Sequence, residues 1–135
     1  MAVHLTKDSI DLGIVVSDGA AALAFYRDTL GIPDTGETML MPGGGTMYRL
    51  QCGSSLLKLV APGTAPTEHA VRGGITAATG HRYVTLTIDN LEEVTAACAE
   101  AGYAVIVPIR EARPGITISM VEDPDGNIVE LLQRT

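Results

Sequence analysis

The feature that most constrains this chain is an order of predicted elements that occurs twice. Residues 10–61 predict a strand, a helix and three strands, and residues 81–132 predict the same order. Adding 72 to a residue number relates LLKLV at 56–60 to IVELL at 128–132. Since 135 residues suit one domain better than two independent cores, the chain is expected to be a single α+β domain. An ordinary α+β sandwich with accidental symmetry is the alternative.

Local signals set the limits of the elements. Asp18 can cap a helix over 20–30, and Asn90 with Glu93 forms a capping-box pattern before a second helix that ends near 101. Strands are expected at 10–16, 37–41, 46–52 and 55–61 in the first half, and at 81–88, 104–110, 115–122 and 128–132 in the second. Two modules follow, module 1 at about 10–61 and module 2 at about 81–132.

The segment between the modules has a different composition. Residues 62–80 are rich in Gly, Pro, Thr and Ala, which predicts a linker or lid and not a core element. The sheet edges that each small module leaves open need pairing, so a homodimer is expected. Whether the modules pair within one chain or between two chains stays open at this stage.

Charge and composition exclude several kinds of partner. The net charge is −7 and no run of Lys or Arg occurs, which disfavours nucleic acid and anionic membranes. No apolar run is long enough to span a bilayer, and the N-terminus does not resemble a signal peptide. Cys52 and Cys98 form no C-x-x-C pair and are interpreted as reduced thiols. The expected location is the cytoplasm.

Alternation along the strands predicts a polar cluster. Asp11 and Tyr83 lie on first strands, on the face opposite the apolar residues that the helix must cover. Lys58 and Glu130 are polar residues within apolar fourth strands. Asp11 and Lys58 are 47 residues apart, as are Tyr83 and Glu130, so the repeat gives the four residues equivalent positions. If the sheets close around a cavity, the four can converge in it as the site for a small-molecule ligand.

Three stretches carry a resemblance to a known family. IDLGIVVSDGAAALAFYRDTLGIP, YVTLTIDNLEEVTAACAEAGYAV and VEDPDGNIVELL resemble the vicinal oxygen chelate superfamily, which includes glyoxalase I, extradiol dioxygenases and bleomycin-binding proteins. The resemblance covers a single domain at residues 8–133. It implies paired βαβββ modules that form an open, barrel-like cleft, and usually a dimer.

The resemblance also implies where a metal would be held. Metal-dependent members carry a His on the first strand of each module and Glu, Gln or His on the fourth, and the matching positions here are Asp11, Lys58, Tyr83 and Glu130. Lys58 has no lone pair to give, and tyrosine is a poor ligand unless ionised. No metal ligand and no cofactor are therefore expected, although His81, two residues before Tyr83, could substitute after a register shift.

Three interpretations of this cluster remain open. In the first, the protein is a lyase- or isomerase-type enzyme that transfers a proton next to a carbonyl without metal. Glu130 is then the base, Lys58 the electrophile, Tyr83 a donor and Asp11 the residue that orients Lys58. In the second, the cleft sequesters a drug or natural product, as bleomycin-binding proteins do. In the third, the four residues form only a structural network.

Further residues are candidates for substrate binding. Arg49 alternates with Gln51 along a strand and can grip a substrate carboxylate, although a solvated edge position is an equal alternative. His81 and Thr85 share the face of Tyr83.

Overall fold

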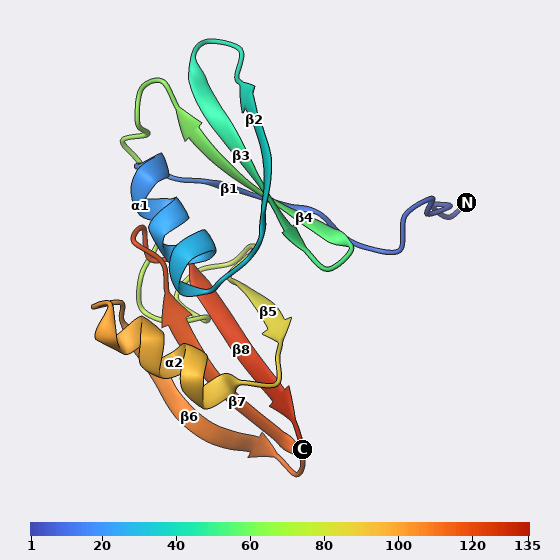
Figure 1. The fold of residues 1–135 in the computed structure, drawn as a ribbon, viewed down its shortest axis with the longest axis vertical. Helices are drawn as coiled ribbons and strands as arrows, with labels where there is room; N and C mark the ends of the chain where they lie inside the picture. The colour runs from blue at the N-terminus through green and yellow to red at the C-terminus, as the bar shows by residue number, and fades with distance from the viewer.

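Each half of the chain builds one four-stranded sheet (Figure 1). The computed structural model describes all residues 1–135. Module 1 contains β1 (Leu12–Val15), helix α1 (Gly19–Leu23) continued by the π-helix η1 (Ala24–Thr29), β2 (Asp34–Leu40), β3 (Gly45–Cys52) and β4 (Ser55–Pro62). Module 2 contains β5 (Tyr83–Thr87), α2 (Leu91–Glu100), β6 (Val105–Arg113), β7 (Ile116–Glu122) and β8 (Ile128–Arg134).

The two sheets have the same topology. Sheet A has the strand order β1-β4-β3-β2, and sheet B has the order β5-β8-β7-β6. In each sheet the first strand of the module pairs in parallel with the fourth, and the other pairs are antiparallel. The predicted pair of βαβββ modules is therefore confirmed.

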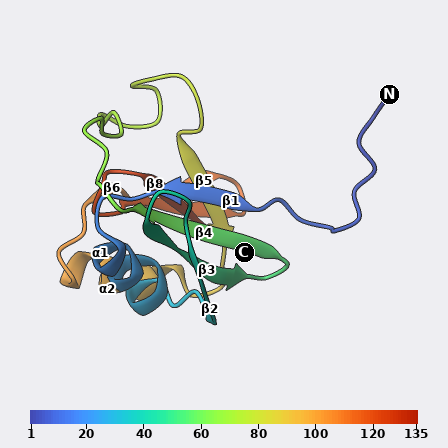
Figure 2. The same ribbon diagram turned by 90° about the horizontal axis from the view of Figure 1, so that it is seen from above.

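One apolar core joins both modules. Both helices lie side by side on one side of the sheets, and the linker lies on the other (Figure 2). The core under the helices draws Phe25 and Leu59 from module 1 and Cys98 and Leu131 from module 2, each at most 1% exposed. We call the side of each sheet away from the helices its open side.

The linker is fixed to the open side of sheet B. The Arg82 guanidinium donates to the carbonyl oxygens of Val71 at 2.8 Å, Gly74 at 2.7 Å and Ile75 at 3.2 Å. Ile75 packs on a second, smaller apolar cluster built mainly from β7 and β8. Arg82 thus donates hydrogen bonds to linker carbonyl groups that take part in no strand pairing. The predicted linker is therefore held against module 2 and covers part of it.

Some element limits differ from those predicted. β1 begins at Leu12, because the preceding Asp11 carboxylate accepts the backbone N–H of Leu56 at 2.8 Å. The predicted capping box at Asn90 is wrong, since no Asn90 side-chain bond caps α2. Gln133 of β8 instead accepts the N–H of Leu91 at 2.9 Å. The predicted Asp18 cap is confirmed by its bond from the N–H of Ala21 at 3.1 Å.

The ends of the chain differ in their packing. The segment before β1 extends away from the body (Figures 1 and 2), and its apolar residues Met1, Val3 and Leu5 are exposed. The C-terminal β8 lies inside sheet B, between β5 and β7. Neither α1, η1 nor α2 has the length and apolar character needed to cross a membrane.

Candidate functional site

Lys58 and Glu130 occupy equivalent places in the two sheets. The strand register sets Gly13 of β1 beside Lys58 of β4, and Thr85 of β5 beside Glu130 of β8. Leu59, next to Lys58, is fully buried beneath the helices. Because strand residues alternate sides, Lys58 projects from the open side, and the same holds for Glu130. The repeat therefore places one ammonium and one carboxylate at corresponding points.

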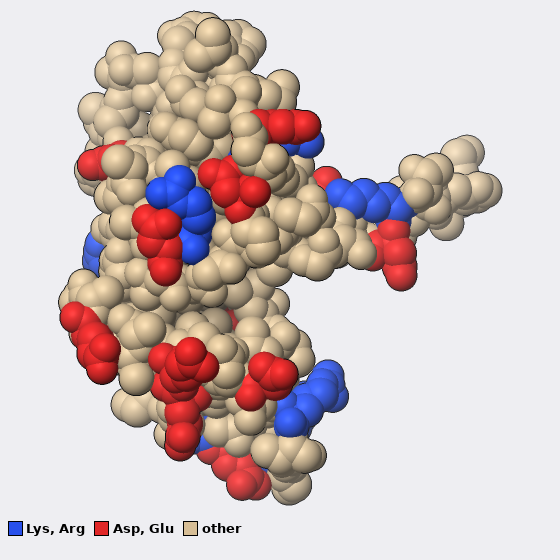
Figure 3. All heavy atoms as spheres, in the orientation of Figure 1, with Lys and Arg blue, Asp and Glu red and all other residues tan.

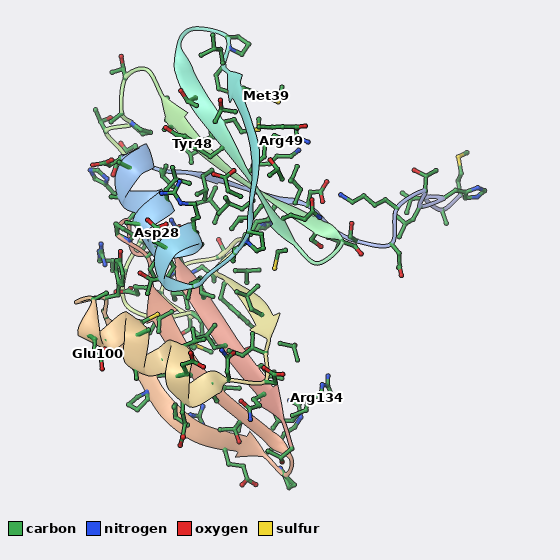
Figure 4. The ribbon with its side chains drawn as sticks, viewed as in Figure 1. Asp28, Met39, Tyr48, Arg49, Glu100 and Arg134 are labelled. Carbon is green, nitrogen blue, oxygen red and sulfur yellow. The ribbon has the colours of Figure 1, made fainter.

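Arg49 lies directly across from Lys58. The two residues are register partners on the antiparallel strands β3 and β4, so their side chains share the open side of sheet A. Tyr48 projects to the opposite side, where its ring closely approaches Gly19 at the start of α1. Figure 4 shows Tyr48 toward α1 and Arg49 away from it, close to Met39. The Arg49 Nη1 donates to the Met39 Sδ at 3.3 Å.

Glu130 has one oxygen held and one free. The Thr85 hydroxyl donates to Glu130 Oε1 at 2.8 Å, and no protein group bonds to Oε2. The carboxylate is partly buried and stands beside the side chain of its cross-strand partner Met120, which is 7% exposed. A carboxylate held in one orientation, with a free oxygen in an apolar setting, is suited to accept a proton.

Asp11 does not orient Lys58. Its carboxylate pairs with the Lys7 ammonium at 2.7 Å and accepts the N–H of Leu56. The hydrogen bond from Lys7, followed by the one from Leu56, holds the pKa of Asp11 below its ordinary value. The charge of Lys58 makes the smallest contribution to this lowering. The predicted Asp11–Lys58 contact is therefore wrong. It failed because the segment before β1 turns to bring Lys7 over Asp11.

Tyr83 and His81 lie at the junction of the two modules. Both line a cavity of about 200 Å³ between β1 and β5, which Gly13 also lines. Tyr83 is 49% exposed. It makes no hydrogen bond to Glu130, because Thr85, two residues along the same side of β5, takes that place. The predicted Glu130–Tyr83 hydrogen bond is thus replaced by one from Thr85.

Gln51 serves the turn between β3 and β4. Its amide donates to the carbonyl oxygens of Gly53 at 2.7 Å and Ser55 at 3.3 Å. Both donors are therefore engaged within the turn. Gln51 therefore has only its Oε1 acceptor left for a ligand.

Lys58 and Glu130 do not meet within one chain. No ion pair of 4.0 Å or less joins them, and neither lines any of the four principal cavities. The predicted convergence of the four polar residues in one cavity is therefore not seen within one chain. They occupy the same side of neighbouring sheets because the modules lie side by side with both helices on one face (Figure 2).

The residues present do not fit a divalent metal ion. The equivalent register positions hold Gly13, Lys58, Thr85 and Glu130, of which only Glu130 is a usual ligand. A set with Asp11 in place of Gly13 fares no better, because the Asp11 carboxylate is already paired with Lys7. No group of three or more His, Cys, Asp or Glu side chains is arranged so that it could hold a metal ion. The Lys58 ammonium would also repel a cation at this point.

Sequence reasoning missed a buried polar centre that joins the modules. Asp123, 3% exposed, accepts the hydroxyl of Tyr26 at 2.8 Å. It also accepts the N–H groups of Asp125 and Asn127 and the side-chain amide of Asn127. The turn signal of Asp123-Pro124-Asp125-Gly126-Asn127 was visible in the sequence, but its partner Tyr26 lies 97 residues away.

The largest cavity is apolar. It has a volume of about 500 Å³ and lies between the end of η1, the β3–β4 turn and the edge of β5. Twelve of its 19 lining residues are hydrophobic, and none of the 19 is charged. Cys52 lies on its wall, and burial raises the pKa of that thiol, so it is not an activated nucleophile.

Acidic side chains gather on the outer surface of α2. Figure 3 shows acidic side chains gathered over α2, whose sequence contains Glu92, Glu93 and Glu100. This face repels anions and offers no cluster of cations.

Comparison with known proteins gives one family. The family model described as "Glyoxalase/Bleomycin resistance protein/Dioxygenase superfamily" matches residues 3–131. No curated protein matches the sequence significantly.

Solved structures agree with this assignment. A glyoxalase family protein from Enterococcus faecalis superimposes with a TM-score of 0.71 at 26% identity, over 93% of this chain and 97% of that one. A glyoxylase/bleomycin resistance protein/dioxygenase domain from Frankia sp. EAN1pec gives 0.79 at 16% identity, over 98% and 94%. The trypanothione-dependent glyoxalase I of Leishmania major gives 0.66 at 23% identity, over 91% and 84%. The last two likenesses concern the fold alone.

Proposed function

This chain belongs to the Glyoxalase/Bleomycin resistance protein/Dioxygenase superfamily, and on that premise we propose that it catalyses metal-independent proton transfer on a small molecule containing a carbonyl or carboxylate. The reaction is of the isomerase or lyase type. Glu130 is the base that removes a proton next to the carbonyl. Lys58 is the electrophile that stabilises the negative charge developing on the carbonyl oxygen. No metal or other cofactor is needed.

The observation that supports this proposal is that the two sheets carry side chains of opposite charge, Lys58 and Glu130, at equivalent positions. Lys58 and Glu130 stand on the open sides of sheets A and B, each in a strand whose neighbouring side chains are buried and apolar. The free Glu130 Oε2 provides a basic lone pair, while the Thr85 bond to Oε1 fixes the plane of the carboxylate. In this proposal Tyr83, which is exposed on the same side of β5, donates a proton to the bound substrate.

A second copy of the chain completes the cleft in this proposal. Three apolar side chains on the open sides remain exposed: Val15 by 55%, Tyr83 by 49% and Met39 by 45%. Covering them favours association, and the basic open side of sheet A complements the carboxylate on sheet B. Laying sheet A of one copy over sheet B of another brings Lys58 opposite the partner's Glu130. The cleft between them would exclude water and strengthen both charges.

Exchange of substrate protons with solvent tests the chemistry whatever the product of the reaction is. Small 2-oxo acids, 2-oxo aldehydes and hydroxyketones are incubated with the purified protein in D₂O, and deuterium at the carbon next to the carbonyl is followed by NMR. We expect enzyme-dependent exchange for at least one compound, lost in Glu130→Gln and strongly slowed in Lys58→Met. Glu100→Gln, an exposed residue at the end of α2, is the matched control.

Mixing the Lys58→Met and Glu130→Gln variants, both of which have little or no activity alone, tests the shared cleft. If each site takes Lys58 from one copy and Glu130 from the other, an equal mixture of Lys58→Met and Glu130→Gln recovers activity in about a quarter of the sites. No recovery, with subunit exchange verified, would place both residues of a site in one chain. Exchange activity retained in Glu130→Gln, or dependent on a stoichiometric transition metal, would refute the mechanism itself.

A binding protein that sequesters an apolar compound is the second candidate. The cavity of about 500 Å³, with no charged lining residue, favours it. A thermal-shift screen of apolar and aromatic compounds tests this function, with Leu86→Phe used to fill the cavity. Hits that lose binding in this variant and show no turnover would support sequestration over catalysis.

A further inference from the structure

Arg49 and Lys58 form a pair of like charges in direct contact range. As cross-strand register partners on β3 and β4 they have Cβ atoms about 4.5–5.5 Å apart. Two cations so placed repel each other and destabilise the sheet. A pairing of this kind needs a compensating anion or a functional reason.

The chain itself supplies little compensation. The Arg49 Nε lies 3.6 Å from Glu37 Oε2, but the Glu37 side chain is 72% exposed and such surface pairs are weak. The Nε is shielded from solvent and has no hydrogen-bond partner, and Nη1 reaches only the weak acceptor Met39 Sδ. Lys58 has no side-chain hydrogen bond and no ion pair.

Space for an anion lies beside the pair. Gly13 is the register partner of Lys58 on its other side, and a Cβ built on Gly13 would meet no atom within 4 Å. Asp11, the nearest carboxylate along β1, already binds Lys7 and the N–H of Leu56. Lys58 therefore borders an open position above Gly13 with its donors available, while Arg49, on the other side of Lys58, carries a guanidinium that lies near Glu37 and Met39 of β2.

We propose that Arg49 and Lys58 form an oxyanion-binding site, in which Arg49 donates through its guanidinium and Lys58 through its ammonium to a phosphate or carboxylate group. As part of the proposed function, on which this assignment of substrate class rests, the site anchors the anionic end of the substrate, while another of the three N–H groups of Lys58 donates to the carbonyl oxygen. Two positive charges match a dianion, so a phosphate or phosphonate monoester binds more tightly than a monocarboxylate. The acidic side chains over α2 repel the same ligands.

NMR titration of the full chain tests the site with two simple probes, methyl phosphate and acetate. We expect both to shift the Arg49 Nε–H and the backbone amides of Gly13 and Lys58, with methyl phosphate the tighter ligand at neutral pH. Raising the ionic strength weakens both. Arg49→Gln and Lys58→Gln each lower the affinity for methyl phosphate by about tenfold or more, because each removes one charged hydrogen bond.

Variants at Gly13 give the sharpest comparison. The backbone of Gly13 does not need a glycine, because its φ is not positive. Gly13→Asp introduces a carboxylate beside Lys58 and abolishes methyl phosphate binding, whereas Gly13→Asn, of the same size, retains most of it. Arg110→Gln, which removes an exposed charge on β6, is the charge-matched control for the Gln variants and leaves affinity unchanged.

Three results would overturn the site. The first is the absence of saturable binding of either probe. The second is an equal loss of methyl phosphate affinity in Arg110→Gln and Lys58→Gln. The third is an equal change of that affinity in Gly13→Asp and Gly13→Asn. Glu130→Gln separates this inference from the proposed function. Retained probe binding in Glu130→Gln, together with lost proton exchange, supports both. Retained probe binding without any exchange activity in the unsubstituted chain supports the oxyanion site and refutes the proposed reaction.

Discussion

The hydrogen bond from Tyr26 to Asp123 fixes module 1 to module 2, and its removal should cost a measurable part of the stability. The bond is 2.8 Å long, and the two residues are 1% and 3% exposed. Tyr26→Phe keeps the ring and leaves the buried carboxylate with three donors instead of four. Because a hydrogen bond to a charged group contributes about 1.5–3 kcal/mol, we expect the free energy of unfolding to fall by that amount at neutral pH.

The same contact predicts a specific dependence on alkaline pH. Burial, followed by the charge of Asp123 and the hydrogen bond to it, raises the pKa of Tyr26 far above its ordinary 10.0. Tyr26 in the unfolded chain ionises near that ordinary value, while the folded chain keeps it neutral. Its contribution to stability is therefore complete below about pH 10. Above it, this contribution falls by about 1.4 kcal/mol per pH unit until the folded pKa is reached.

Urea unfolding at about pH 7 and about pH 11 measures both effects. Tyr103→Phe is the matched control, because it removes a hydroxyl that makes no hydrogen bond in the chain. We expect Tyr26→Phe to be less stable than Tyr103→Phe at neutral pH, and the gap to narrow at high pH. Equal stabilities at neutral pH, or the same alkaline slope for Tyr26→Phe and the unsubstituted chain, would refute the reasoning.

Two further predictions concern contacts outside the candidate site. The pKa of Asp11, measured by NMR, should lie below 3.8 and rise in Lys7→Met, since the Lys7 hydrogen bond is the main cause of its depression. Because the pKa is lower in the folded chain, the Asp11 carboxylate stabilises the fold at pH values above its pKa in the unfolded chain. This stabilisation is lost as the pH falls through its pKa in the folded chain. An unchanged Asp11 pKa in Lys7→Met would contradict the pairing. Arg82→Met removes three bonds to linker carbonyls and should speed proteolysis between 71 and 75 several-fold. If Arg110→Met speeds it equally, Arg82 does not hold the linker.

The elements of the fold could be predicted because their signals are local. The Asp18 cap, the end of the first helix near residue 30 and the apolar strands depend on residues close together in the chain, and the structure has them within a few positions. The offset of 72 also placed Lys58 and Glu130 correctly as equivalents, because the parallel pairing of first and fourth strands is the same in both sheets.

The contacts of the site could not be predicted in the same way. Alternation predicted a side for Asp11, but it could not show that Lys7, four residues earlier, would pair with its carboxylate. It likewise gave Tyr83 and Thr85 the same side without deciding which one reaches Glu130. Such choices depend on strand register to within one residue, and the start of β1 was placed two residues too early.

Opposite charges at equivalent places restrict what the two modules can bind together. A site for a dication would need ligands with lone pairs from both sheets, and Lys58 gives sheet A an ammonium at the position in question. A molecule with an anionic end and an acidic C–H bond suits the arrangement better. Its oxyanion would be held by Arg49 and Lys58, and its proton would face Glu130. The distance between the two groups is not a local property of either module, so it depends on how two open sides are brought together. The mixing experiment measures this, because recovery of activity requires Lys58 and Glu130 to act across two copies.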